Sequence, residues 1–161
     1  MKKLIFVMAF AVITLMSVWA EKGDMGLGVQ FDYATKHSLP GLGLQFQVEP
    51  VSHFRIAPEF IYYFKNDNVS AYNLNLNLHY LIQTGGAGFY IYPLAGFSYA
   101  HFTSDVGLNI DNTWNRFGAN VGCGAEYRIS NSKLSFYTEQ RFQILKDCNQ
   151  SVTCLGMKYS F

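Results

Sequence analysis

The stretch from residue 71 to residue 82, AYNLNLNLHYLI, alternates apolar and polar side chains almost without interruption. The even-numbered positions from Tyr72 to Ile82 are apolar, whereas the odd-numbered positions from Asn73 to His79 are polar. Successive side chains of a β-strand point to opposite faces, so this pattern predicts a strand with one apolar and one polar side. The apolar side would face the core of a soluble sheet or the lipid around a membrane barrel, and the stretch alone leaves both arrangements open.

The composition limits the classes of protein to which the chain can belong. Its 161 residues are enough for one domain, and its net charge of +1 comes without basic runs, so a nucleic-acid partner is not expected. Beyond residue 20 no apolar run approaches the about 20 residues that a transmembrane helix needs. The sequence therefore argues against a helical membrane protein.

The first twenty residues, MKKLIFVMAFAVITLMSVWA, have the layout of a secretory signal peptide. Lys2 and Lys3 precede an apolar stretch from Leu4 to Met16, and small or tolerated residues follow as far as Ala20. We therefore expect a cleaved signal peptide over residues 1–20 and one exported domain over residues 21–161.

Turn-forming residues interrupt the exported part at seven places, for example at TKHSLPG, QTGGAG and DVGLNIDNTWN. Most segments between them have about 9 to 14 residues, and a tilted transmembrane strand needs about 9–11. No segment after the signal shows helical periodicity, so the expected fold is all-β, an eight-stranded antiparallel up-and-down barrel. The expected strands are 25–35, 41–49, 54–64, 71–82, 89–103, 116–129, 133–145 and 152–161.

Charged side chains within these strands lie on the polar parity and not on the apolar one. Five acids and five bases share this face: Asp32, Glu49, Glu59, Glu126, Glu139, Arg55, Arg116, Arg128, Arg141 and Lys158. In segment 89–103 both faces are apolar, and Ile91, Ala95, Phe97 and Tyr99 are expected outward because Gly96 and Ser98 suit a crowded interior.

Three observations favour a transmembrane barrel with the asparagines inside. The polar face is balanced in charge and rich in glycine and amides, as expected where side chains must neutralise one another in a confined interior. Tyr and Phe gather near the strand ends of the apolar face, as in interfacial aromatic girdles. The final residue, Phe161, is an aromatic residue on the apolar parity.

Together, the signal peptide, the eight strands, the short turns and the terminal YSF resemble the small eight-stranded outer membrane β-barrel proteins of Gram-negative bacteria. The resemblance covers residues 25–161 and implies a place in the outer membrane, with outer membrane lipid around the barrel and both termini in the periplasm. It also implies that the barrel-assembly machinery recognises the last strand, in which Leu155, Met157, Tyr159 and Phe161 match the pattern of this family.

An eight-stranded barrel is just wide enough for side chains to fill it. With ten charged groups competing for that volume, we expect a packed polar interior held by ion pairs, since an unpaired buried charge is costly. The expected role is structural or one of surface interaction, without the activity of a wide general pore. The longest outward loop, Ser104 to Asn115, could contact a partner through Leu108, Ile110 and Trp114, but Trp114 and Ile110 are expected to lie at the lipid interface instead.

Two alternatives predict different behaviour. A secreted, soluble, lipocalin-like barrel would turn its apolar face inward and bind a ligand there. A lipid A-modifying outer membrane enzyme would need a His and a Ser on the outer rim, where the sequence offers Ser98, His101 and Ser104. The local His-x-Ser arrangement of such enzymes is missing and His101 has the lipid-facing parity, so we predict no catalytic residues, cofactor or metal site.

The three cysteines have different expected environments. Cys123 has the lipid-facing parity and is interpreted as a small apolar residue. Cys148 and Cys154 flank the last outer loop in an oxidising compartment, so a disulfide between them could close that loop. A tight hairpin would instead place a residue nearer than Cys154 opposite Cys148.

Overall fold

The computed structural model describes residues 24–161, except for 37, 67–68, 87, 106–110 and 147. The expected signal peptide, residues 1–20, lies outside the described residues. The described part consists of β-strands and turns, as predicted from the alternating segments. In this part no helix is long and apolar enough to cross a membrane.

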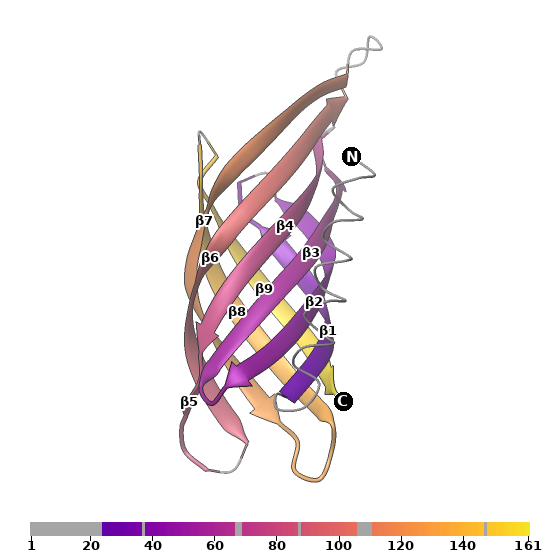
Figure 1. Ribbon diagram of the computed structural model, residues 1–161. Helices are drawn as coiled ribbons and strands as arrows, with labels where there is room; N and C mark the ends of the chain where they lie inside the picture. Colours follow the sequence, from indigo (N-terminus) through magenta and orange to yellow (C-terminus); the bar gives the residue numbers. More distant parts are fainter. Residues whose placement is uncertain (1–23, 37, 67–68, 87, 106–110, 147) are drawn as a thin grey trace.

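Eight long antiparallel strands form the wall of the barrel in the described residues (Figure 1). The short strand β5 continues the line of β4, because both pair with β6 in one register, Leu78 opposite Ala95 and Ile82 opposite Ile91. The strands are β1 Asp24–Ala34, β2 Leu39–Val51, β3 Phe54–Asn66, β4 Val69–Tyr80, β5 Ile82–Gln83, β6 Phe89–Asp105, β7 Asp111–Arg128, β8 Leu134–Leu145 and β9 Gln150–Ser160.

The sheet closes on itself because each strand pairs with its neighbours in sequence and β1 also pairs with β9. β1 begins and β9 ends at the same end of the barrel, where Gly26 lies opposite Ser160. We call this lower end of Figure 1 the base, and the opposite end the loop end. The eight-stranded fold predicted from the sequence is confirmed.

The longest hairpin of the barrel is formed by β6 and β7, which rise above their neighbours at the loop end (Figure 1). Their pairing continues through Thr103 and Thr113 to Asp105 and Asp111. The outer loop expected over residues 104–115 is therefore shorter than predicted, because regular backbone pairing extends into both of its ends.

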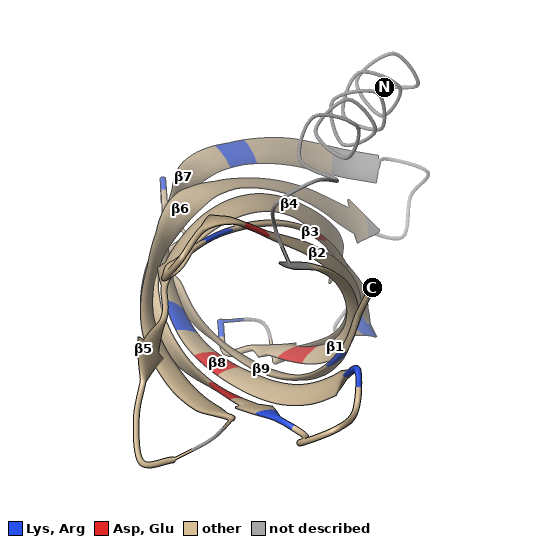
Figure 2. Cartoon of the chain, turned by 60° about the horizontal axis from the view of Figure 1, so that its bottom comes forward, with Lys and Arg blue, Asp and Glu red and all other residues tan. Residues whose placement is uncertain are grey.

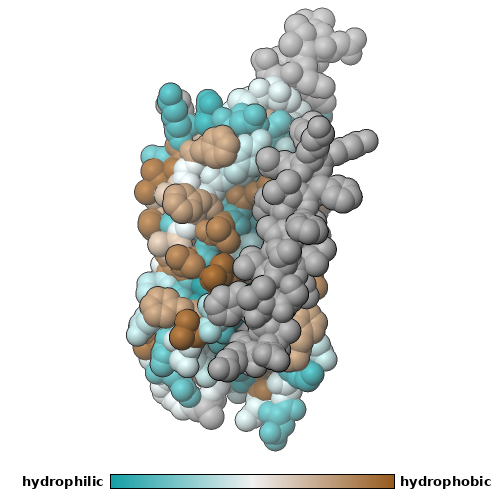
Figure 3. All heavy atoms as spheres, viewed as in Figure 1, coloured by the Kyte–Doolittle hydropathy of each residue, from teal (hydrophilic) through white to brown (hydrophobic). Residues whose placement is uncertain are grey.

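The alternating stretch of residues 71–82 places its asparagines inside the barrel and its leucines outside. Leu76 and Leu78 expose 48% and 55% of their surface, whereas Asn73 and Asn77 expose none. In β6, Phe97 points outward and Ser98 is buried, as expected because Gly96 and Ser98 suit the interior. The side view shows brown apolar residues on the middle of the wall and teal polar residues near both ends (Figure 3).

Candidate functional site: the barrel interior

The charged side chains nearest the base form one connected group, which we call the base cluster: Glu49, Arg55, Glu126, Arg128 and Lys158. Arg55 pairs with Glu49 at 2.8 Å and with Glu126 at 2.5 Å. Arg128 bridges the same two carboxylates at 2.5 and 2.9 Å, and the Lys158 ammonium lies 2.7 Å from Glu126. β2, β3, β7 and β9 are thereby tied together across the lumen. Figure 2, turned so that the base comes forward, shows acidic and basic positions around the ring of strands.

A second group, the middle cluster, consists of Asp32, Glu59, Glu139 and Arg141. The Arg141 guanidinium pairs with Asp32 at 2.6 Å, contacts Glu59 directly and lies 3.7 Å from Glu139. All four residues are buried. One cation therefore serves three carboxylates, while the base cluster has three cations and two carboxylates, so the two clusters carry opposite excess charges along the axis.

Neutral donors supply the remaining hydrogen bonds of the middle cluster. The amide of Gln30 donates to Asp32 at 2.8 Å, and that of Asn75 donates to Glu59 at 2.7 Å. The Tyr92 hydroxyl donates to Glu139 at 3.0 Å. Hydrogen bonds to charged groups of this kind help to offset the cost of removing the carboxylates from water.

Large tyrosines fill the lumen where the facing strands carry glycine. The Tyr137 ring lies against Gly28 of β1 and Gly156 of β9, so a Cβ at either glycine would overlap it. The Tyr92 ring fits against Gly124 of β7 in the same way. The glycines on the polar parity are therefore needed for the close approach of these rings to the backbone.

Above the middle cluster the interior changes from ions to amides. Gln143 accepts hydrogen bonds from Asn73 at 3.3 Å and Gln150 at 2.7 Å, and it donates to Ser98 at 3.3 Å. These polar groups are buried but uncharged. They separate the charged clusters from an apolar region at the loop end.

That apolar region, which we call the loop-end plug, was not foreseen from the sequence. Phe102 and Trp114 stack there with ring centres 5.7 Å apart. Trp114 thus packs against the interior of the barrel instead of lying at the lipid interface, whereas Leu108 and Ile110 lie outside the described residues. The buried members of the plug are Ala34, Leu39, Ile61, Tyr63, Ala71, Ala100, Phe102, Leu145, Cys148 and Val152.

Nine of the ten predicted interior charges lie in the two clusters, and Arg116 does not. Arg116 is half-buried near the loop end, and its guanidinium donates to the carbonyl oxygen of Asn115 at 3.4 Å. Arg116 lies on β7 two residues from Trp114, at the height of the loop-end plug. It is therefore too far along the strand to reach the two clusters nearer the base.

The predicted residues of the last strand point to the outside. Leu155, Met157, Tyr159 and Phe161 are exposed on one face of β9 and of the residue after it. The ring of Tyr159 meets that of Phe161 edge to face, with centres 5.9 Å apart. The structure thus presents the four side chains as one outward row.

The structure holds Cys148 and Cys154 as free, buried thiols. Glu139 lies opposite Cys154, and the four residue steps of extended chain from Gln150 to Cys154 span about 13 Å at roughly 3.3 Å each. A disulfide needs Cα atoms about 4.4–6.8 Å apart, so this geometry does not favour the bridge considered from the sequence. Burial raises the pKa of the Cys148 thiol, which makes it less reactive.

The groups considered for catalysis do not come together. Ser98 is buried inside the barrel, whereas His101 lies on the outer side, stacked on Tyr72 with ring centres 4.7 Å apart. The Nδ1 atom of His101 lies 2.6 Å from the side-chain oxygen of Asn115. In the part of the chain that the structure describes, no group of three or more His, Cys, Asp or Glu residues could hold a metal ion.

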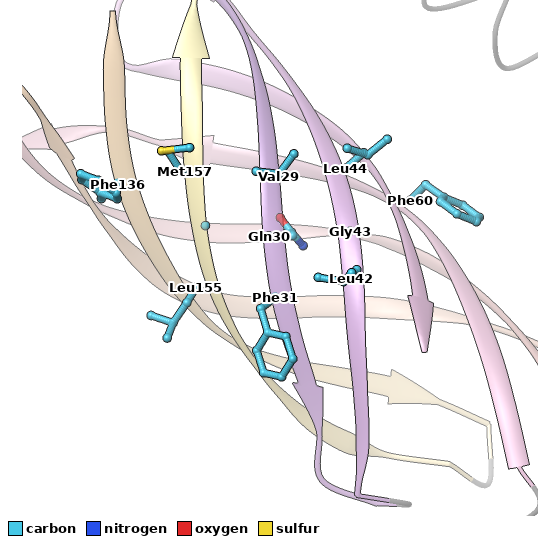
Figure 4. Close-up of a pocket in the computed structure, with 11 residues that line it drawn as sticks. Val29, Gln30, Phe31, Leu42, Gly43, Leu44, Phe60, Phe136, Leu155 and Met157 are labelled. Atoms are coloured by element: carbon cyan, nitrogen blue, oxygen red, sulfur yellow. The ribbon is translucent and has the colours of Figure 1, made fainter. Parts of the chain in front are cut away.

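An apolar hollow of about 680 Å³ lies on the outer wall over β1, β2 and β9 (Figure 4). The outward side chains of Val29, Phe31 and Leu44 contribute to its lining, and Phe60 and Phe136 lie to either side. This hollow faces the lipid side of the wall. It therefore does not provide the internal ligand cavity that a lipocalin-like barrel requires.

Comparisons with known proteins agree with this architecture. The sequence matches the family described as outer membrane protein beta-barrel domain over residues 9–161. No curated protein sequence matches the chain. Among solved structures, the N-terminal β-barrel domain of OprF from Pseudomonas aeruginosa is similar, with a TM-score of 0.70, 18% identity, and coverage of 87% of this chain and 100% of that domain.

Two further solved barrels are also similar. Neisserial surface protein A has a TM-score of 0.65 and 16% identity, over 86% of this chain and 97% of that one. Ail, the attachment invasion locus protein of Yersinia pestis, has a TM-score of 0.59 and 14% identity, again over 86% of this chain and 97% of that one. At these identities the likeness concerns the fold.

Proposed function

Because the chain belongs to the outer membrane protein beta-barrel domain family and is an outer membrane protein, we propose that it acts as a closed barrel in the cell envelope. Its role is structural or one of surface interaction, and it is neither a wide general pore nor an enzyme. The observation that supports this proposal is that side chains from the base cluster to the loop-end plug are buried inside the barrel.

The charged interior supports closure because its ions are bound to one another. Arg55, Glu126, Glu59 and Arg141 are almost completely buried, and the salt bridges from Arg55 to Glu126 and from Arg141 to Glu59 span the lumen between distant strands. An ion that entered would have to break these pairs, each of which is expensive to separate in a low dielectric. The apolar plug adds a second barrier, since hydrophobic constrictions exclude water and ions.

The outward row of the last strand supports a role in assembly. We assign Leu155, Met157, Tyr159 and Phe161 to the signal that the barrel-assembly machinery recognises during insertion. Their side chains lie on one exposed face, so an unfolded or partly paired last strand would present the same alternating apolar pattern.

The alternatives have less support from the structure. A lipocalin-like ligand binder needs an apolar interior, whereas the middle of this lumen is charged and its apolar hollow lies outside. A catalytic pair needs its base within hydrogen-bond reach of its nucleophile, and His101 and Ser98 lie on opposite sides of the wall.

Conductance measurements in planar lipid bilayers test this proposal. When the refolded chain inserts, it should not produce the stable, large conductance steps of a general pore. Comparison of boiled and unboiled samples on a denaturing gel shows that the barrel is folded. A known wide porin in the same bilayer is the positive control. The proposal would be contradicted if folded protein, recognised because its gel mobility shifts only on boiling, gave stable openings on the nanosiemens scale.

A further inference from the structure

The charges buried inside the barrel do not balance. Among the described residues the two clusters contain five acids and four bases, because Arg116 lies apart from them. Without the two partly exposed members, Glu49 and Arg128, four buried acids still face three buried bases. One positive charge is therefore missing from a region in which an unpaired charge is expensive.

Glu139 is the carboxylate that lacks a direct counterion. The two terminal nitrogens of Arg141 are used by other acids, since Nη1 contacts Glu59 and Nη2 contacts Asp32. Only the Nε atom of Arg141 faces Glu139, and their separation of 3.7 Å is longer than a hydrogen bond. The three cations of the base cluster contact the two carboxylates of that cluster. The charge deficit is therefore located at Glu139.

Neutral groups make the close contacts of the Glu139 carboxyl group. The Tyr92 hydroxyl lies 3.0 Å from Oε1, and the Gln45 amide nitrogen lies 3.4 Å from the same oxygen. Oε2 has no hydrogen-bond partner among the described residues, and the whole residue is only 1% exposed. A hydroxyl can donate to a carboxylate or accept from a carboxylic acid, so the Tyr92 contact suits a protonated Glu139 as well.

His79 is the other group that could supply the missing charge, but its surroundings oppose this. Its Nε2 atom lies 3.9 Å from Oε1 of Glu139, and neither ring nitrogen has a hydrogen-bond partner among the described residues. An imidazolium would bury two N–H donors without acceptors, and the positive charges of Arg55 and Lys158 act against a further cation there. A proton on Glu139 removes a buried charge, whereas a proton on His79 adds one.

We propose that Glu139 is a buried proton-binding site, protonated in the folded barrel at mildly acidic pH, where a glutamate in water is ionised. The proton leaves the middle cluster with one excess negative charge, which the one excess positive charge of the base cluster balances. Loss of the proton restores the imbalance in the lumen. The barrel therefore contains a pH-sensitive element at the centre of its wall.

The groups around Glu139 leave few other candidates for a pH response. β2 and β7 present neutral residues to it, Gln45 and Gly124. In the mildly acidic range arginine is always charged, and phenol and thiol groups are neutral. The ionisable neighbours are Asp32 of β1, Arg55 and Glu59 of β3, His79 of β4, Tyr92 of β6, Tyr137 and Arg141 of β8, and Cys154 of β9.

Infrared spectroscopy of the refolded barrel, in a detergent without carbonyl groups, detects the proton directly. A protonated carboxyl group absorbs above the amide I band, and at about pH 6 exposed carboxyl groups are ionised. The wild-type barrel should show this absorption and Glu139→Gln should lose it. Glu49→Gln changes an acid that is paired with two arginines, so it should keep the absorption. The proposal is overturned if the folded wild type lacks the absorption, if Glu139→Gln retains it or if Glu49→Gln loses it.

Urea unfolding in the same detergent provides the second measurement. Because the folded chain binds one more proton than the unfolded chain, the folding equilibrium constant of the wild type relative to Glu139→Gln should fall about tenfold from about pH 5.5 to about pH 6.5. Both proteins contain the same four histidines, so the comparison cancels their titration. Glutamine matches a protonated glutamate in shape and charge, so the variant should fold, as judged by gel mobility before and after boiling. A ratio that does not change with pH, or a variant that does not fold, would refute the site.

Discussion

Arg141 provides the sharpest test of the charged interior. Substituting Arg141→Met keeps a long apolar side chain but removes the cation that contacts both Asp32 and Glu59. Loss of one partner from a buried ion pair costs about 3–5 kcal/mol, because the other charge remains buried and unpaired. With two carboxylates in direct contact with Arg141 and Glu139 only 3.7 Å away, we expect the upper part of this range, about 4–5 kcal/mol.

Arg128→Met is the matched control within the same lumen. The Arg128 side chain is 25% exposed, and both of its carboxylate partners keep Arg55 as a second cation. Its loss should therefore reduce the free energy of unfolding by about 1 kcal/mol, similar to a partly solvated ion pair.

The assay is urea unfolding of the barrel in lipid vesicles, followed by the fluorescence of Trp114. The sequence has two tryptophans, and the other, Trp19, belongs to the expected signal peptide. Linear extrapolation gives the free energy of unfolding for each variant. Neutralising the stranded acids, by adding Asp32→Asn and Glu59→Gln to Arg141→Met, should restore much of the loss. Equal losses for the Arg141 and Arg128 variants, or no recovery in the triple variant, would refute the reasoning.

Two matched pairs of substitutions and one single substitution test other parts of the barrel. Phe102→Ala in the loop-end plug should cost about 3–5 kcal/mol of unfolding free energy, whereas Phe97→Ala on the lipid side should cost much less, because lipid can refill the space. Gly156→Ala should cost about 1–3 kcal/mol through overlap with an aromatic ring, while Gly26→Ala meets mainly the flexible methylenes of a lysine and should cost less. Both pairs are measured by the same urea titration. Phe161→Ser should lower the heat-modifiable fraction in cells without changing the unfolding free energy of purified, refolded barrel, and a change in both would argue against an assembly role.

The fold was predictable because its signal is local. Alternation with a period of two tells which side chains share a face, as in the asparagines and leucines of residues 71–82. Charges then tell which face is inside, since ionised groups facing lipid are expensive. The eight strands therefore followed from the sequence, with differences of a few residues at the ends where pairing extends into the turns.

The loop-end plug could not be predicted from single strands. Leu39, Ile61 and Phe102 are apolar residues at positions of the polar parity, and each is an isolated exception within its own strand. They form a cluster only when the register of the closed sheet places the exceptions of several strands at the same height.

The sequence by itself determined the number of strands, the face on which each side chain lies and the charge content of the interior. Only the tertiary structure decided which acid meets which base. Arg141 reaches Asp32 and Glu59 across sequence separations of 109 and 82 residues. The physical reason is that parity is set by each strand's own backbone, whereas the height of a residue along the barrel depends on the pairing and tilt of all the strands together once the sheet has closed.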